Sequence, residues 1–111
     1  MKPRRPNILI IMSDEHAPQF SSIHGHPLVH SPNMERLAGM GVTFDNAYCN
    51  SPICGPSRMS FMTGRYINRI GAYDNGFPMS SGMVTWAHCL KNAGYDVAIS
   101  GKQHFCGPDQ L

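Results

Sequence analysis

An α/β fold with a mainly parallel sheet is predicted for this chain by three patterns. Residues 7–12 contain the uninterrupted apolar run Ile-Leu-Ile-Ile-Met, which is typical of a central strand buried on both faces. A second strand pattern covers residues 95–100. Helical patterns cover residues 32–40, 56–65 and 84–93 between them. Strands that alternate with helices form β-α-β units, and these units build a parallel sheet.

The composition places the chain among ordinary globular proteins. It has 111 residues, of which 41% are hydrophobic, and a net charge of +2. This is enough for one small domain with its own core. The charge is too small to indicate a nucleic-acid partner or a membrane surface. The apolar run at 8–12 is too short for a signal or membrane-spanning segment, so we expect no membrane association and a cytoplasmic location.

The four cysteines predict neither a zinc knuckle nor a disulfide framework. They lie at positions 49, 54, 89 and 106 without paired C-x-x-C spacing, which argues against a zinc knuckle. A chain without an export signal is also expected to keep its thiols reduced. Individual cysteines are therefore interpreted by their local surroundings.

Helix ends are marked by conventional capping residues. Ser31 is the expected N-cap of the first helix, Pro32 its first residue, and Gly39 or Gly41 its end. Its expected apolar stripe consists of Met34, Leu37, Ala38 and Met40. Gly94 is the expected end of the 84–93 helix, inside which Cys89 is expected in the core or at its edge.

The remaining segments are predicted as one further strand and two loops. Residues 42–48 alternate as a strand does. Residues 65–81 are expected to be mostly loop, with a turn at Asp-Asn-Gly 74–76. A solvated loop is preferred to a metal site for the three histidines at 24, 26 and 30, because the intervening Gly and Pro prevent a shared helical face.

The most informative stretch is Cys-Gly-Pro-Ser-Arg at 54–58. Pro52, Gly55 and Pro56 interrupt regular structure, and a helical pattern then runs to Gly64. Cys54 should therefore lie just before a helix N-terminus, where free N–H groups and the helix dipole favour an anion. Arg58 adds a planar cation about one turn on. The alternative is a buried, inert cysteine in a proline-rich loop.

Charged residues follow both predicted parallel strands. Asp14 and Glu15 come directly after the first strand, and Lys102 and His104 follow the second. Ligands of open α/β sheets bind beyond the carboxyl ends of the strands, so these residues are expected to share one crevice with the Cys54 helix. The alternatives are a loop carboxylate that caps the next turn for Asp14, and surface residues for Lys102 and His104.

Three motifs in this order resemble the sulfatase family, within the alkaline-phosphatase-like superfamily. They are the Cys-x-Pro-Ser-Arg signature at 54–58 with Thr-Gly-Arg at 63–65, the strand and acidic residue at 7–14, and Gly-Lys-x-His at 101–104. The stretches 73–75 and 101–111 look most like the choline-sulfatase branch. The resemblance implies the N-terminal portion of an α/β/α sandwich and a hydrolase of small sulfate esters.

The same resemblance implies an unusual nucleophile. A maturation enzyme would oxidise Cys54 to formylglycine, an aldehyde whose hydrate attacks sulfur with one hydroxyl and expels sulfate with the second. Arg58 would hold the hydrate, Lys102 would bridge it to the sulfate, and His104 would hydrogen-bond one of these oxygens. Asn75 would reach the sulfate.

A divalent metal, most typically Ca²⁺, is implied beside this nucleophile. Asp14, Glu15 and the oxidised Cys54 are its expected ligands. Sulfatases usually carry Asp-Asp where this sequence has Asp14 and Glu15, and Asp14 is the safer ligand because the longer Glu15 stem can point its carboxylate elsewhere.

Sulfatases take further metal ligands and a general acid from a later half. Residues 1–111 are therefore interpreted as an N-terminal part of a catalytic domain, which needs a C-terminal half or partner chain for activity. Two alternatives stay open. One is a phosphonate monoester or phosphodiester hydrolase of the same superfamily, and the other is a non-catalytic fragment whose exposed sheet edge pairs with another chain.

Overall fold

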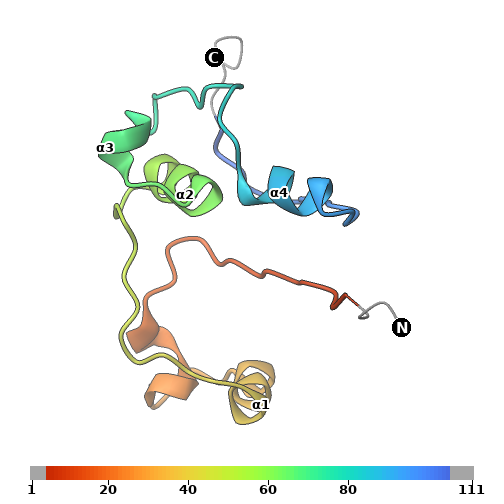
Figure 1. Cartoon of the computed structure of the whole chain (residues 1–111). Helices are drawn as coiled ribbons and strands as arrows, with labels where there is room; N and C mark the ends of the chain where they lie inside the picture. The colour runs from red at the N-terminus through yellow and green to blue at the C-terminus, as the bar shows by residue number, and fades with distance from the viewer. Residues whose placement is uncertain (1–4, 106–111) are drawn as a thin grey trace. The chain divides into compact units, whose positions relative to one another are not determined.

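Six short helical elements make up the regular structure of the described chain. The structure is a computed structural model and describes residues 5–105 (Figure 1). The chain divides into two compact units, Met1–Ala47 and Tyr48–Leu111. In order, the elements are the 3₁₀ turns η1 (Pro18–Phe20) and η2 (Ser22–His24) and the helices α1 (Pro32–Met40), α2 (Cys54–Thr63), α3 (Ile67–Ile70) and α4 (Trp86–Asn92).

Helix α1 of the first unit begins and ends where its capping residues predict. Ser31 is the N-cap, Pro32 is the first residue and Gly41 is the C-cap. The Ser31 side chain makes no capping hydrogen bond; its N–H donates to Ser22 Oγ (3.1 Å). The helix buries no residue, and the predicted apolar stripe is open, with Leu37 64% and Met40 72% exposed.

The loop before α1 is closed by a histidine side chain. The N–H groups of Leu28 and Val29 both donate to Nδ1 of His26, at 3.1 and 3.0 Å. This bifurcated acceptor fixes the turn before α1, consistent with the predicted loop.

The strands predicted at 7–12, 42–48 and 95–100 are wrong for this structure. None of these segments forms a strand within residues 5–105. The apolar side chains of 8–12 are 47–83% exposed, whereas a central strand is covered on both faces. A strand depends on hydrogen bonds to a neighbouring strand, and the described residues supply no such neighbour. The predicted parallel sheet is therefore not shown.

Helix α2 carries four of the buried residues of the second unit. Gly55, Pro56, Met59 and Met62 are buried, and Ala72 is buried after α3. Helix α2 contacts both α3 and α4. Phe61 of α2 meets Trp86 of α4 edge to face, with ring centroids 6.0 Å apart. Figure 1 shows α2 and α3 following one another around a short connection.

The C-terminal ends of α2 and α3 are each capped by a glycine in the left-handed conformation. Gly64 (φ 65°) ends α2 as predicted, and Gly71 (φ 72°) ends α3. Residues 65–81 are mostly loop as predicted, with α3 as a short helix that the sequence pattern did not predict. Its first N–H, at Ile67, donates to Asn50 Oδ1 (2.9 Å). This acceptor is seventeen positions away, so the local sequence pattern could not predict the start of α3.

Helix α4 has a complete cap at each end. Thr85 is the N-cap, and both its N–H (3.2 Å) and its Oγ1 (2.7 Å) hydrogen-bond His88 Nδ1. At the other end Gly94 (φ 85°) donates to Lys91 O, and Tyr95 donates to Leu90 O. This is the pattern of a Schellman motif.

Two sequence expectations for α4 need adjustment. The helix begins at Trp86, two residues later than the pattern at 84–93 predicts. Cys89 is exposed rather than in the core or at its edge; the core-facing residues of this short helix include the half-buried Trp86. Predictions that involve Cys106 and residues 107–111 lie outside the described residues. Over residues 5–105, no helix has both the length and the apolar character that crossing a membrane requires.

Candidate active site

The predicted nucleophile lies inside the first turn of α2, not before it. Cys54 is the first residue of the helix, and Ile53, in extended conformation, is the N-cap. The predicted start at 56 is therefore two residues late, because Gly55 and Pro56 are accommodated in the first turn instead of interrupting it. Cys54 is a half-buried free thiol, so the alternative of a fully buried cysteine does not hold.

Most N–H groups of this first turn already donate hydrogen bonds within the chain. Gly55 N–H donates to Asn75 Oδ1 (2.8 Å), Pro56 has no N–H, and Ser57 N–H donates to Ile53 O (2.9 Å). A helix start normally offers several free donors to an anion. Here the backbone contributes little, so binding of an anion near Cys54 depends on nearby cationic side chains.

Asn75 reaches α2 from a loop of the second unit. The loop is closed locally, because Gly76 N–H donates to Asp74 Oδ1 (2.8 Å) and the Tyr73 and Phe77 rings meet edge to face at 6.0 Å. This agrees with the turn predicted at 74–76. The carboxamide oxygen of Asn75 thus has a backbone partner, and the predicted contact between Asn75 and sulfate stays a prediction.

Arg58 and Lys102 are joined although they are 44 positions apart. Arg58 Nη1 donates to the backbone carbonyl of Lys102 (2.7 Å). A guanidinium has five N–H donors in a planar fork, and this bond uses one of them to tether Arg58 to the 101–104 segment. One turn of α2 is thereby connected to the segment that carries both Lys102 and His104.

His104 has two unusual features. Its backbone φ is +57°, a conformation that costs a non-glycine residue about 1–3 kcal/mol. Its Nδ1 is buried and has no hydrogen-bond partner in the described part of the chain. Buried polar atoms are nearly always paired, so the imidazole has an unused hydrogen-bonding position, as a ligand-binding histidine would.

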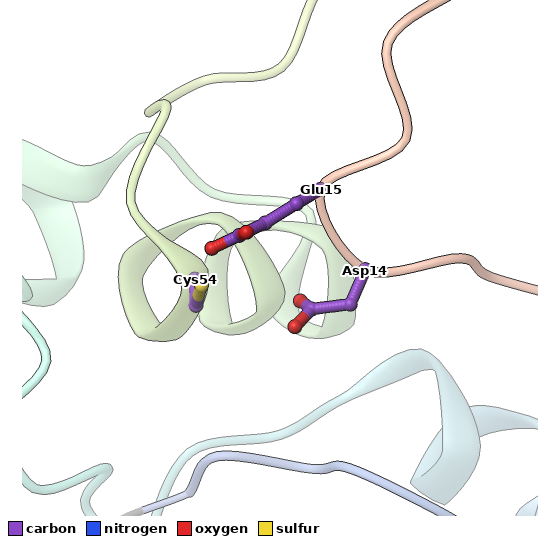
Figure 2. Close-up of side chains that lie close together, drawn as sticks. All are labelled: Asp14, Glu15 and Cys54. Carbon is purple, nitrogen blue, oxygen red and sulfur yellow. The ribbon is translucent and has the colours of Figure 1, made fainter. Parts of the chain in front are cut away.

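Asp14 and Glu15 of the first unit present two neighbouring carboxylates. Both are exposed, and each has an oxygen within 4.8 Å of the other's. Figure 2 shows the two side chains leaving adjacent positions of the chain, and labels Cys54 in the first turn of α2. Glu15 has φ +53°. Two adjacent carboxylates form the hard oxygen donor set that Ca²⁺ prefers, so the donor set fits such a cation.

Glu15 and His104 are the two non-glycine residues with positive φ in residues 5–105. Both are among the site residues that the sequence predicts. Strained backbone is found more often at functional sites than elsewhere, and the roles of these two residues stay predictions. The prediction that Asp14 and Glu15 share one crevice with Cys54, Arg58, Lys102 and His104 stays a prediction.

Comparison with known proteins identifies the family. The sulfatase family model matches residues 6–107. The chain belongs to the sulfatase family. This sulfatase chain is 44% identical, over its whole length, to choline-sulfatase of Rhizobium meliloti, of which it spans 22%. It is 37% identical to N-acetylglucosamine-6-O-sulfatase of Bacteroides thetaiotaomicron, with 96% of this chain and 19% of the relative covered.

A solved structure shows the same fold. The sulfatase chain superposes with a TM-score of 0.83 and 37% identity on BT4656 in complex with its substrate D-glucosamine-2-N,6-O-disulfate. The match covers 92% of this chain and 22% of the solved one. The chain thus spans about a fifth of the length of the relatives that it matches.

Proposed function

We propose that this chain forms the nucleophile-bearing part of a sulfuric ester hydrolase that uses formylglycine made from Cys54. The observation that supports this most directly is the position of Cys54 at the start of α2, with Arg58 one turn on and anchored to Lys102. The chain also belongs to a family whose model matches residues 6–107. We further propose choline sulfate as the substrate, on the 44% identity with a choline-sulfatase.

In its formylglycine form, residue 54 supplies a hydroxyl nucleophile and a second hydroxyl that releases sulfate. The other residues of the chain bind and orient. Arg58, whose guanidinium is tethered by the Lys102 carbonyl, holds the side chain of residue 54. The Lys102 ammonium neutralises sulfate oxygens, and the imidazole of His104 hydrogen-bonds one of them.

Asp14 and Glu15 would hold the divalent cation, together with the modified side chain of residue 54. Bound Ca²⁺ would offset negative charge on the sulfate oxygens. Because two carboxylates do not complete the six to eight oxygen ligands of Ca²⁺, we propose that further ligands, and the acid that protonates the leaving alcohol, come from residues beyond this chain. A formylglycine-generating enzyme is the proposed maturation partner.

The test uses the full-length protein and two independent measurements. The mass of the peptide containing residue 54 is measured first; conversion of cysteine to formylglycine lowers it by about 18 Da. Turnover is then measured with choline sulfate, an aryl sulfate, glucosamine-6-sulfate and a phosphonate monoester. The expected result is a converted peptide and the highest kcat/KM with choline sulfate. An unconverted cysteine in an active enzyme, or a preference for the phosphonate, would overturn the proposal.

A further inference from the structure

The hydrogen bond between Asn75 and Gly55 gives the nucleophile helix a cap that its own sequence lacks. The residue at the N-cap position, Ile53, has no polar side chain. A helix start usually obtains an acceptor from a Ser, Thr, Asp or Asn at that position. In α2 the acceptor is the Asn75 carboxamide oxygen, 2.8 Å from the Gly55 nitrogen and twenty positions along the chain.

The absence of a side chain at Gly55 permits this approach. A Cβ built at Gly55 would lie 3.1 Å from Asn75 Oδ1, which is tighter than ordinary van der Waals contact. The next atoms it would meet are Asn75 Cα at 3.5 Å and Asp74 O at 3.8 Å, both at normal contact distances. The single close obstacle is therefore the Asn75 oxygen itself.

The loop that carries Asn75 is closed upon itself. Asp74 Oδ1 accepts from Gly76 N–H (2.8 Å), and Phe77 N–H donates to Asp74 O (3.4 Å). A local turn of this kind presents the Asn75 oxygen from a defined position. The bonded donor belongs to the peptide that joins residues 54 and 55, so the cap orients the backbone next to the nucleophile.

From these contacts we propose that Asn75 is a positioning residue, which holds the backbone of residue 54 through the Gly55 N–H. The proposal rests on the proposed function, because it assigns Asn75 a part in the same reaction. The carboxamide oxygen is used by Gly55, so a contact with a sulfate oxygen would have to come from the carboxamide nitrogen. A displacement of about 1 Å at a reacting group can cost about a hundredfold in rate.

The first experiment compares Asn75→Ala, Asn75→Asp and the control Asn68→Ala in the full-length protein. Rates are divided by the fraction of residue 54 converted, measured by mass. Asn75→Ala is expected to lower kcat about a hundredfold with little change in KM. Asn75→Asp keeps the acceptor oxygen, so it is expected to lose clearly less kcat than Asn75→Ala, while its charge raises KM for an anionic substrate. Asn68, exposed on α3, gives a silent control.

The second experiment is a double-mutant cycle with Gly55→Ala. The added methyl group is expected to displace the Asn75 oxygen and lower kcat. Because that oxygen is the one close obstacle, Gly55→Ala combined with Asn75→Ala should be no slower than Asn75→Ala alone. Losses in kcat that simply multiply would show that Gly55 and Asn75 act independently of one another, and would overturn the proposal.

The outcomes separate this proposal from the proposed function. If Asn75→Ala keeps wild-type kcat, or if Asn75→Asp loses kcat as severely as Asn75→Ala, the cap does not position residue 54. If Asn75→Ala does not fold, Asn75→Asp decides, since it preserves the shape and acceptor of the side chain. Failure of the sulfatase activity itself would appear in the wild-type protein, as an unconverted residue 54 or no turnover of any sulfate ester.

Discussion

Helices α1 and α2 have similar lengths and a proline in the first turn, yet they are stabilised in different ways. Helix α1 has the polar N-cap Ser31 and buries no residue. Helix α2 has the apolar N-cap Ile53, buries four residues and receives its acceptor from Asn75. Helix α1 thus begins and ends at residues that local sequence marks and still buries nothing, whereas the helix that carries the nucleophile is held by contacts distant in sequence.

Replacing the nucleophile of α2 should have the largest effect. Cys54→Ala in the full-length enzyme is expected to lower turnover of sulfate esters by at least about three orders of magnitude, as removal of a nucleophile does in other enzymes. Cys89→Ala is the matched control, because Cys89 is exposed on α4. Steady-state assays with mass-verified protein measure both.

Cys54→Ser sharpens the same test. A serine hydroxyl can attack sulfur once but has no second hydroxyl to expel sulfate, so we expect a stoichiometric covalent sulfate ester and no steady turnover. Turnover of Cys54→Ser at the wild-type rate would contradict the formylglycine mechanism.

Truncation of a methionine side chain should destabilise the protein strongly in α2 and weakly in α1, because only the α2 residue is buried. Met59 in α2 is 1% exposed, and Met40 in α1 is 72% exposed. Met59→Ala is expected to lower the free energy of unfolding by about 2–5 kcal/mol, and Met40→Ala to change it by less than about 0.5 kcal/mol. Urea denaturation provides both values. Equal losses would show that Met40 is covered in the intact protein.

Removal of N-cap side chains should distinguish an N-cap residue whose side chain hydrogen-bonds the helix from one whose side chain makes no such bond. Thr85 hydrogen-bonds His88 at the start of α4, whereas the side chain of Ser31 makes no capping bond at the start of α1. Thr85→Ala should lower the free energy of unfolding by about 1 kcal/mol. Ser31→Ala should change it by less than about 0.5 kcal/mol. A larger loss for Ser31→Ala in thermal denaturation would argue for a cap bond in solution.

A small gain in stability is expected within α1. Gly39 lies inside this helix, and a Cβ there would meet no atom within 4 Å. Gly39→Ala should raise the free energy of unfolding by about 0.5–1 kcal/mol, because alanine loses less backbone entropy in a helix. Gly55→Ala is the contrasting change in α2, where the Cβ meets Asn75. A destabilised Gly39→Ala would show that this face of α1 is covered.

Local signals in the sequence determined the helix ends that depend on hydrogen bonds over a few residues. Pro32 and Gly41 set the bounds of α1, and Gly64 and Gly94 end α2 and α4 in left-handed conformations. The motif at 54–58 also led to the sulfatase family, which the family model supports over residues 6–107.

Tertiary structure decided what depends on residues distant in sequence. The bonds of Gly55 to Asn75, Ile67 to Asn50 and Arg58 to Lys102 span 20, 17 and 44 positions. Apolar patterning could not have found them, since each joins a polar side chain to a backbone group. The strand predictions were wrong for the same reason. A strand is completed by hydrogen bonds to a neighbouring strand and not by its own apolar residues.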